Sequence, residues 1–292
     1  MSSVPTHGKW ADLYRLRPNG FSGDGLNDVT WGTAFNGAAS AYYEVVIDAE
    51  DTPDTFKWRK NGGDWTTGVA ITGGAQTLDE AQTITFATTT GHTLNDQWVI
   101  GNLKDEPCTE DGLTGQITDA TKRILNPFNL PTFADSGSEV VTHIDPVRGL
   151  ATFGGNVTAV TVDGNNAFVV KSGLQQVGYL IGWDMNYEIE MGDAARCQQH
   201  WKEFIPGQGS GSGNANAFFI GADSWFDTME DELGKVQEQH FLELFTYEPS
   251  ADQAGDHFNV WATMAGLSIS TALNVLIQEN LSFTLQGAPL LS

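Results

Sequence analysis

The stretch that decides the fold is WDMNYEIEM, residues 183–191, in which apolar and polar residues alternate without interruption. The apolar members are Trp183, Met185, Tyr187, Ile189 and Met191, and the polar members are Asp184, Asn186, Glu188 and Glu190. Successive side chains of a strand point to opposite faces of a sheet, so this alternation predicts a β-strand with one apolar face and one wet, acidic face.

Other parts of the chain show the same two-residue period. Leu281, Phe283 and Leu285 alternate with polar residues near the end of the sequence, which predicts a closing strand. Short apolar runs between residues 27 and 101 are separated by turn signals, and Asn61-Gly62 is typical of a tight hairpin. With 33 glycines and 10 prolines, the sequence favours many turns over many long helices. We therefore expect a mainly β protein.

Two short helices are predicted to flank this β core. Asp193 can cap a helix over 194–204, where apolar residues fall at spacings of three and four, and a similar stripe predicts a helix over 227–239. Between them lies GQGSGSGNAN, residues 207–216, which we expect to be a loop too rich in glycine and serine to hold one conformation unaided.

The charge of the chain restricts its partners. It carries 14 Lys and Arg against 37 Asp and Glu, a formal net charge of −23, whereas nucleic-acid binding needs clustered basic residues on phosphates. An acidic surface suits a wall along which DNA slides without binding, although acidity also simply keeps an abundant protein soluble. We expect no membrane partner and no signal peptide, since no long apolar run is present. The two cysteines, Cys108 and Cys197, fit a reducing cytoplasm.

No catalytic, cofactor-binding or metal-binding residues are predicted, and we expect no enzyme. The glycines of 207–216 lack the Gly-Lys-Ser/Thr ending of a phosphate loop. Cys197 and His200 lie one helical turn apart, but the sequence offers no second ligand pair. Three tryptophans between residues 58 and 98 could form a platform on which a sugar stacks, but large aromatic residues are more often part of a core. They are Trp58, Trp65 and Trp98.

Residues 177–221 resemble the major tail tube proteins of long-tailed bacteriophages. The shared pattern is a long alternating strand, a short helix carrying a Trp, an Ile-Pro-Gly stop, a Gly/Ser loop and another strand. The C-terminal SFTLQGAPLL is similar to the closing strand of that family. Separately, TPDTFKWRKNGGDWTTGVAIT with GHTLNDQW is similar to a small β module of phage virion proteins.

The resemblance implies a β-sandwich or barrel-like core with one or two short flanking helices, interrupted by a small all-β module. Residues 1–23 and 104–292 would form the core, and 24–103 the inserted β-sandwich module. Core subunits would join as homo-hexameric rings stacked into a filament.

The function implied is that of a structural virion protein forming the tail tube that conducts DNA into the host, without binding that DNA specifically. Other tail proteins would be its partners: the tape measure, terminator and distal tail proteins. The protein would be assembled in the host cytoplasm and reside in the virion tail. Alternatives are a tail-associated carbohydrate-binding or adhesion protein, a tail terminator and a distal tail protein.

Two sets of residues are candidates for roles in such a tube. The acidic residues predicted to face the lumen are Asp184, Glu188 and Glu190. The residues predicted to form a loop between rings are Gly209, Ser210, Gly211, Ser212 and Gly213.

Overall fold

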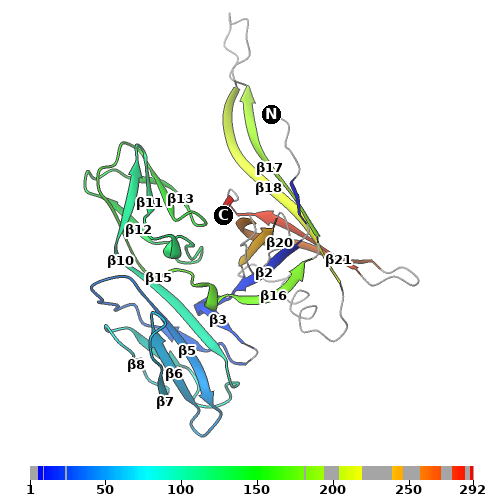
Figure 1. Ribbon diagram of the computed structural model, residues 1–292. Helices are drawn as coiled ribbons and strands as arrows, with labels where there is room; N and C mark the ends of the chain where they lie inside the picture. Colours follow the sequence, from blue (N-terminus) through cyan, green and yellow to red (C-terminus); the bar gives the residue numbers. More distant parts are fainter. Residues whose placement is uncertain are drawn as a thin grey trace, which may run out of the picture. The chain divides into compact units, whose positions relative to one another are not determined.

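The protein is mainly β, as the alternating patterns predict (Figure 1). The computed structural model describes residues 6–8, 10–23, 25–180, 182–193, 204–218, 239–245, 257–270, 278–286 and 290–291. The chain divides into two compact units: Met1–Arg15 with Gln176–Ser292 forms unit 1, and Leu16–Gln175 forms unit 2. Among the described residues, no helix is long and apolar enough to cross a membrane.

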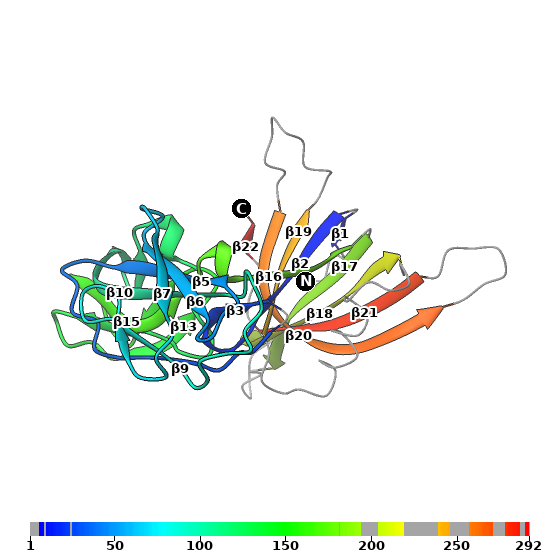
Figure 2. The same cartoon turned by 90° about the horizontal axis from the view of Figure 1, so that it is seen from below.

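Unit 1 is built on one 9-stranded sheet with the order β1-β17-β18-β21-β20-β19-β2-β16, to which β22 adds by pairing with β20. Figure 2 shows its central strands fanned side by side. The bounds are β1 (Thr6–Gly8), β2 (Trp10–Leu16), β16 (Gln175–Leu180), β17 (Gly182–Asp193), β18 (Phe204–Phe218), β19 (Gln239–Phe245), β20 (His257–Ser270), β21 (Gln278–Leu285) and β22 (Leu290–Leu291).

The buried rings of Phe241 and Trp261 lie on one face of β19 and β20, and the opposite face of the sheet carries the main core of unit 1. Its largest members are Trp183, Phe283 and Leu281, each at most 4% exposed, and they come from β17 and β21. Neighbouring strands add Leu242 and Val260 to the same face. The strands predicted at 183–191 and around Leu281–Leu285 are therefore confirmed, and Trp183, Met185, Leu281, Phe283 and Leu285 of the apolar halves are buried.

Unit 2 contains a 10-stranded sheet, whose main path is β13-β14-β11-β10-β5-β6-β7, and a 3-stranded sheet β4-β9-β8. The strand bounds are β3 (Phe21–Ser22), β4 (Val29–Trp31), β5 (Ala41–Ala49), β6 (Thr55–Lys60), β7 (Thr66–Ala70), β8 (Gln76–Thr77), β9 (Thr83–Phe86), β10 (Gln97–Asp111), β11 (Thr114–Ile117), β12 (Thr132–Asp135), β13 (Val141–Asp145), β14 (Leu150–Phe153) and β15 (Val160–Phe168). Single 3-10 turns lie at η1 (Pro18–Gly20), η2 (Ala120–Lys122) and η3 (Lys171–Gly173).

An aromatic cluster forms one core of unit 2, and a second core includes Phe153 and Phe168. Phe21, Phe56, Phe86 and Trp98 are fully buried, and the Phe86 and Trp98 rings meet edge to face with centroids 5.4 Å apart. Large buried aromatics contribute more apolar area than other side chains, so this cluster is expected to contribute a large part of the stability of the unit.

The hairpin predicted at Asn61-Gly62 is confirmed. The two residues connect β6 to β7, and both have positive φ angles, 50° and 68°. Asparagine and glycine tolerate this left-handed conformation better than other residues, which explains the choice of sequence at the turn.

Unit 2 is wider than the module predicted over 24–103. The predicted boundary at residue 103 falls inside β10, a 15-residue strand that pairs with β5 through Asn102 and with β11 from Cys108 onward. A strand hydrogen-bonded on both sides of a proposed boundary joins the two segments into one body. Residues 104–175 accordingly belong to the same compact unit as the whole of the predicted module.

The two predicted helices fall mostly outside the described residues. Residues 194–203 and 219–238 are not described, so nothing is concluded about helices there. The last residues of each predicted helix, Phe204 and Gln239, are instead the first residues of β18 and β19.

Candidate functional surface

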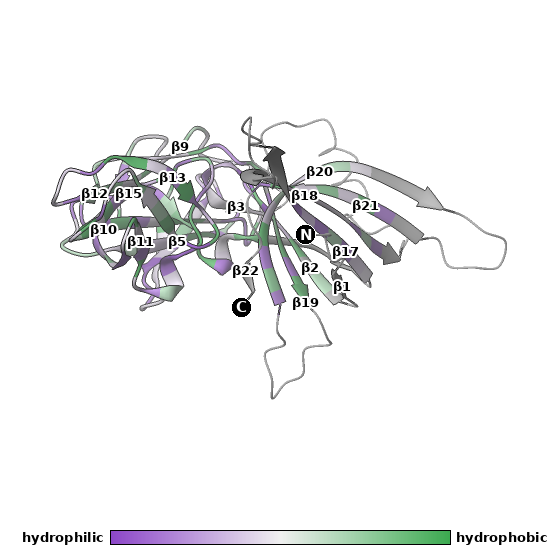
Figure 3. Cartoon of the chain, turned by 90° about the horizontal axis from the view of Figure 1, so that it is seen from above, coloured by the Kyte–Doolittle hydropathy of each residue, from purple (hydrophilic) through white to green (hydrophobic). Residues whose placement is uncertain are grey.

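Strand β17 presents two chemically different faces. Trp183 and Met185 are buried, whereas Asp184 and Asn186 are half-exposed and Glu188 is exposed. Figure 3 colours the strands of this sheet by hydropathy. The prediction of one core face and one wet, acidic face is thus confirmed over residues 183–188. Glu190 lies in the same strand, but its side chain is outside the described ones.

The segment predicted as a glycine-serine loop is a strand, and that prediction is wrong. Residues 207–216 lie within β18, which runs antiparallel to β17, with Glu188 opposite Ser210 and Asp184 opposite Asn214. The alternation of glycine with serine or asparagine is itself a two-residue period that could have revealed the strand.

The glycines of β18 lie beneath large side chains from neighbouring strands. A Cβ atom at Gly209 would collide with the Tyr187 ring, one at Gly211 with Leu285, and one at Gly213 with Phe283. Glycine is the residue that permits such close approach, although it lowers intrinsic strand propensity. Neighbouring strands, which the local sequence does not show, therefore make this glycine-rich segment an ordered strand.

The other side of the same strands forms a continuous polar face. We use this name for the wet positions of β17, β18, β21 and β20, where hydroxyl, amide and carboxylate groups follow one another across the sheet. Its members are Asp184, Asn186, Glu188, Ser210, Ser212, Asn214, Ser282, Thr284 and Thr263.

The two acidic groups of the polar face are hydrogen-bonded to uncharged donors. Asp184 Oδ1 accepts from the backbone N–H of Asn214 at 2.7 Å and from its Nδ2 at 3.0 Å. Glu188 Oε1 accepts from Asn186 Nδ2 at 2.9 Å. Within the described residues of unit 1, Arg15 is the one lysine or arginine, and it is buried. The polar face is therefore acidic and offers no basic group to a phosphate.

The ends of β17 and β18 form a two-stranded ribbon. Residues 186–193 of β17 and 204–211 of β18 pair with one another, while β1 joins β17 at 183–185 and β21 joins β18 from residue 212. We call these two segments the distal ribbon, which extends from the sheet in Figure 1. Among the described residues, both of its outer edges have no neighbouring strand.

The predicted inter-ring residues lie at this place. Gly209, Ser210 and Gly211 belong to the distal ribbon, and Ser212 and Gly213 lie where β21 begins to pair. These residues form a strand and not the predicted loop. The predicted contact of these residues with a neighbouring ring stays a prediction.

The rest of the described chain carries histidine, cysteine and carboxylate side chains that could take part in chemistry. There, no group of three or more His, Cys, Asp or Glu side chains is placed to hold a metal ion. Cys197 and His200 lie outside the described residues. Cys108 is buried, and burial together with Glu110 and Glu106 raises the pKa of its thiol to about 12, so it stays protonated and unreactive at neutral pH.

The three tryptophans considered for sugar stacking do not form one platform. Trp98 is fully buried in the aromatic cluster, and Trp58 packs at its margin. Trp65 is half-exposed and lies beneath two cations, Lys57 Nζ at 5.0 Å and Arg59 Cζ at 4.4 Å from its ring centroid. The platform hypothesis is wrong because Trp98 belongs to the core.

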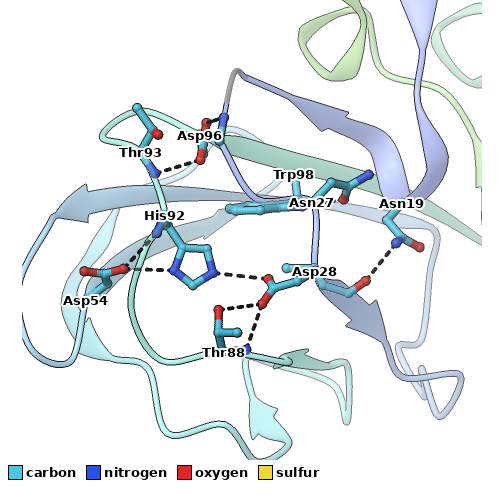
Figure 4. A network of polar contacts seen from close by, with 11 residues as sticks. Asn19, Asn27, Asp28, Asp54, Thr88, His92, Thr93, Asp96 and Trp98 are labelled. Carbon is cyan, nitrogen blue, oxygen red and sulfur yellow. Dashed lines mark hydrogen bonds and ion pairs between the residues drawn. The ribbon is translucent and has the colours of Figure 1, made fainter.

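A buried histidine joins three loops of unit 2, as Figure 4 shows. His92 Nδ1 lies 3.0 Å from Asp54 Oδ2, and His92 Nε2 lies 3.1 Å from Asp28 Oδ1. Asp28 also accepts from the backbone N–H of Thr88 at 2.7 Å. Because His92 has no exposed side-chain surface, the arrangement stabilises the fold and is closed to a substrate.

These features define a mainly β protein with a polar sheet face and a projecting ribbon. Comparisons with known proteins do not assign it to a narrower class. No family model matches the sequence, and no curated protein matches it. A chain from the C6-symmetric tail of an empty gene transfer agent particle aligns over 42% of this chain and 88% of its own, with 14% identity and a TM-score of 0.32. A chain from the virion of a native gene transfer agent particle aligns over 42% and 92%, with 13% identity and a TM-score of 0.31. Similarity this low supports no conclusion about function.

Proposed function

We propose that this protein is a structural subunit of a phage-type tail, which assembles with copies of itself into rings that stack as a tail tube. The observation that carries the proposal is the distal ribbon, whose two strands have unpaired outer edges within the described part of unit 1. The sequence resemblance of residues 177–221 to tail tube proteins gives independent support.

The physical argument concerns sheet edges. A two-stranded ribbon is marginally stable in water on its own, and its open edges present unpaired backbone N–H and C=O groups. A strand from another copy of the chain would satisfy these groups. If the surface that accepts the ribbon differs from the ribbon itself, the contact is heterologous and generates a closed ring or an open filament.

The polar face supplies the second part of the proposal. We infer that Asp184 and Glu188, with Glu190 further along β17, line the channel of the tube. Carboxylates without neighbouring cations repel the phosphates of passing DNA, so the molecule slides without binding. The proposed role is structural, and it requires no catalytic group.

The assembly proposal is tested by negative-stain microscopy and sedimentation of the purified full-length protein. Stacked rings or tubes are the expected result. A protein that remains monomeric at high concentration, with its fold intact, would contradict the proposal. Single rings that do not stack, with few copies per virion, would instead favour a terminator or distal tail protein.

The channel proposal has its own matched test. Particles carrying Asp184→Lys and Glu188→Lys should assemble normally and eject DNA more slowly, because cations now face the phosphates. Asp64→Lys with Asp111→Lys makes the same charge change at exposed positions of unit 2 and serves as the control. Equal ejection rates for both double variants would show that the polar face is ordinary solvent surface.

A further inference from the structure

Unit 2 contains a small pocket in which asparagines make up half of the lining residues. Its volume is about 160 Å³, and five separate segments of the chain form its wall. We call it the amide pocket. Six residues that line it are Asn19, Trp31, Asn102, Asn129, Asn165 and Asn166. The pocket is smaller than the roughly 300–1,000 Å³ of sites for drug-sized ligands, so it suits a single small ring.

The lining of the amide pocket is uncharged. Its walls hold no lysine, arginine, histidine, aspartate or glutamate among the described residues, although the whole chain has a net charge of −23. Two threonines, Thr30 and Thr33, add hydroxyl groups, and Trp31 and Ile100 add apolar surface. The chemistry is therefore that of neutral hydrogen bonding beside one aromatic ring.

Hydrogen bonds fix the wall of the pocket in place. Asn102 is fully buried, donates from Nδ2 to Gln82 Oε1 at 2.9 Å and accepts at Oδ1 from the Asn166 backbone N–H at 2.8 Å. Asn165 Nδ2 donates to the Thr33 carbonyl at 2.9 Å across 132 residues of sequence. A wall built this way is ordered before a ligand arrives, which lowers the entropic cost of binding.

Part of the polar surface remains available to a ligand. Trp31 Nε1 donates to the Asn19 carbonyl at 3.0 Å, so the position of the indole is fixed. The side-chain amide of Asn166 and the hydroxyls of Thr30 and Thr33 make no hydrogen bond with the described residues. These groups can both donate and accept.

We propose that the amide pocket binds a neutral saccharide through one sugar ring. Sugar hydroxyls both donate and accept hydrogen bonds, as amide groups do, and the C–H face of a sugar can pack against Trp31. A charged ligand would find no counter-ion, and an apolar ligand would desolvate several amides without replacing their hydrogen bonds. The residues of the amide pocket belong to unit 2 and those of the polar face to unit 1, so this proposal does not rest on the proposed tail role.

The test is saturation-transfer NMR and calorimetry on the full-length protein, with glucose, galactose and N-acetylglucosamine as probes. Glucuronate serves as an anionic counterpart of glucose. We expect saturable binding of at least one neutral sugar and at least several-fold weaker binding of glucuronate. No saturable signal from any neutral probe, or preference for glucuronate, would overturn the proposal.

Two variants of pocket residues test whether the sugar binds in the amide pocket. Asn166 has a φ of 50°, which glycine accepts, so Asn166→Gly removes the amide with little backbone strain. Loss of one such contact should weaken binding roughly threefold to tenfold. The matched control is Asn95→Gly, an exposed position outside the pocket with a φ of 71°.

Thr30→Val provides a second test that does not depend on the Asn166 turn. It removes a hydroxyl from an exposed position of β4 and keeps a branched side chain of similar shape. Weaker binding by Asn166→Gly or Thr30→Val, with Asn95→Gly unchanged, supports the pocket. Wild-type affinity in both pocket variants would show that the sugar binds elsewhere.

Discussion

The two units of this protein are stabilised in different ways. Unit 2 encloses an aromatic cluster and a buried His92 network between its sheets. Unit 1 places its main core on one face of a single sheet, buries Phe241 and Trp261 on the other face at β19 and β20, and leaves the outer edges of the distal ribbon without a neighbouring strand among the described residues. Unit 2 therefore closes its aromatic core between two sheets, whereas the described part of unit 1 leaves a two-stranded ribbon with open edges, the feature that the proposed assembly would use.

The largest expected loss of stability comes from a substitution in the buried His92 network of unit 2. In His92→Leu, Asp28 and Asp54 lose their shared partner while buried or nearly so, which should destabilise unit 2 by about 3–5 kcal/mol. Hydrogen exchange followed by mass spectrometry should show faster exchange in β5, β9 and β10, with unit 1 unchanged.

The control for that experiment is His143→Leu. His143 is an exposed histidine of β13, so its substitution should change stability by less than about 0.5 kcal/mol. If His92→Leu costs no more than His143→Leu, the buried network does not contribute to the stability of unit 2, and the comparison between the units fails.

A second prediction addresses the glycine strand of unit 1. The Cβ of Gly213→Ala would meet the Phe283 ring and the backbone of Asp184, so overpacking should destabilise unit 1 by about 1–3 kcal/mol. Ser212→Ala, one residue away on the polar face, should change stability by less than about 0.5 kcal/mol. Equal effects on urea unfolding of the two variants would mean that β18 is not packed as described.

Acid should weaken unit 2 through Asp54. Burial acts to raise the pKa of Asp54, but hydrogen bonds from the His92 side chain and backbone, and from the Asp51 backbone, lower it below its usual value. A carboxyl group whose pKa is lowered by folding contributes stability above its unfolded pKa of about 4, and this stability is lost as pH falls through the folded pKa.

Thermal unfolding between pH 6 and pH 3 measures this contribution. The midpoint temperature for unfolding of unit 2 should decrease once the pH is below about 4. In Asp54→Asn this temperature should depend less on pH. Asp64→Asn, at an exposed position, is the control and should follow the wild type. If the midpoint temperature of Asp54→Asn changes with pH as steeply as that of the wild type, Asp54 does not cause the loss of stability in acid.

The smallest expected effect concerns the surface of unit 2. Trp65→Ala removes the ring beneath Lys57 and Arg59, and an exposed cation–π contact contributes about 0.5–1 kcal/mol. Arg59 keeps its ion pair with Glu44, so the strand itself should remain folded. Urea unfolding beside the exposed control Thr67→Ala measures the loss, and a cost above about 2 kcal/mol would show that Trp65 is part of the core.

The sequence alone determined which faces of several strands are buried. Alternation is a local property, because each residue of a strand points away from its neighbours whatever else the chain does. For that reason the strands at 183–191 and 281–286, the acidic face with Asp184 and Glu188, and the hairpin at Asn61-Gly62 could all be predicted.

The tertiary structure decided what depends on distant neighbours. Residues 207–216 form a strand because Tyr187, Leu285 and Phe283 cover its glycines, and a glycine-rich segment carries no local sign of that cover. The extent of unit 2 depends on the partners of β10. The amide pocket and the His92 network each join loops and strands separated by tens of residues, and hydrogen bonds across such distances exist only after the chain has folded.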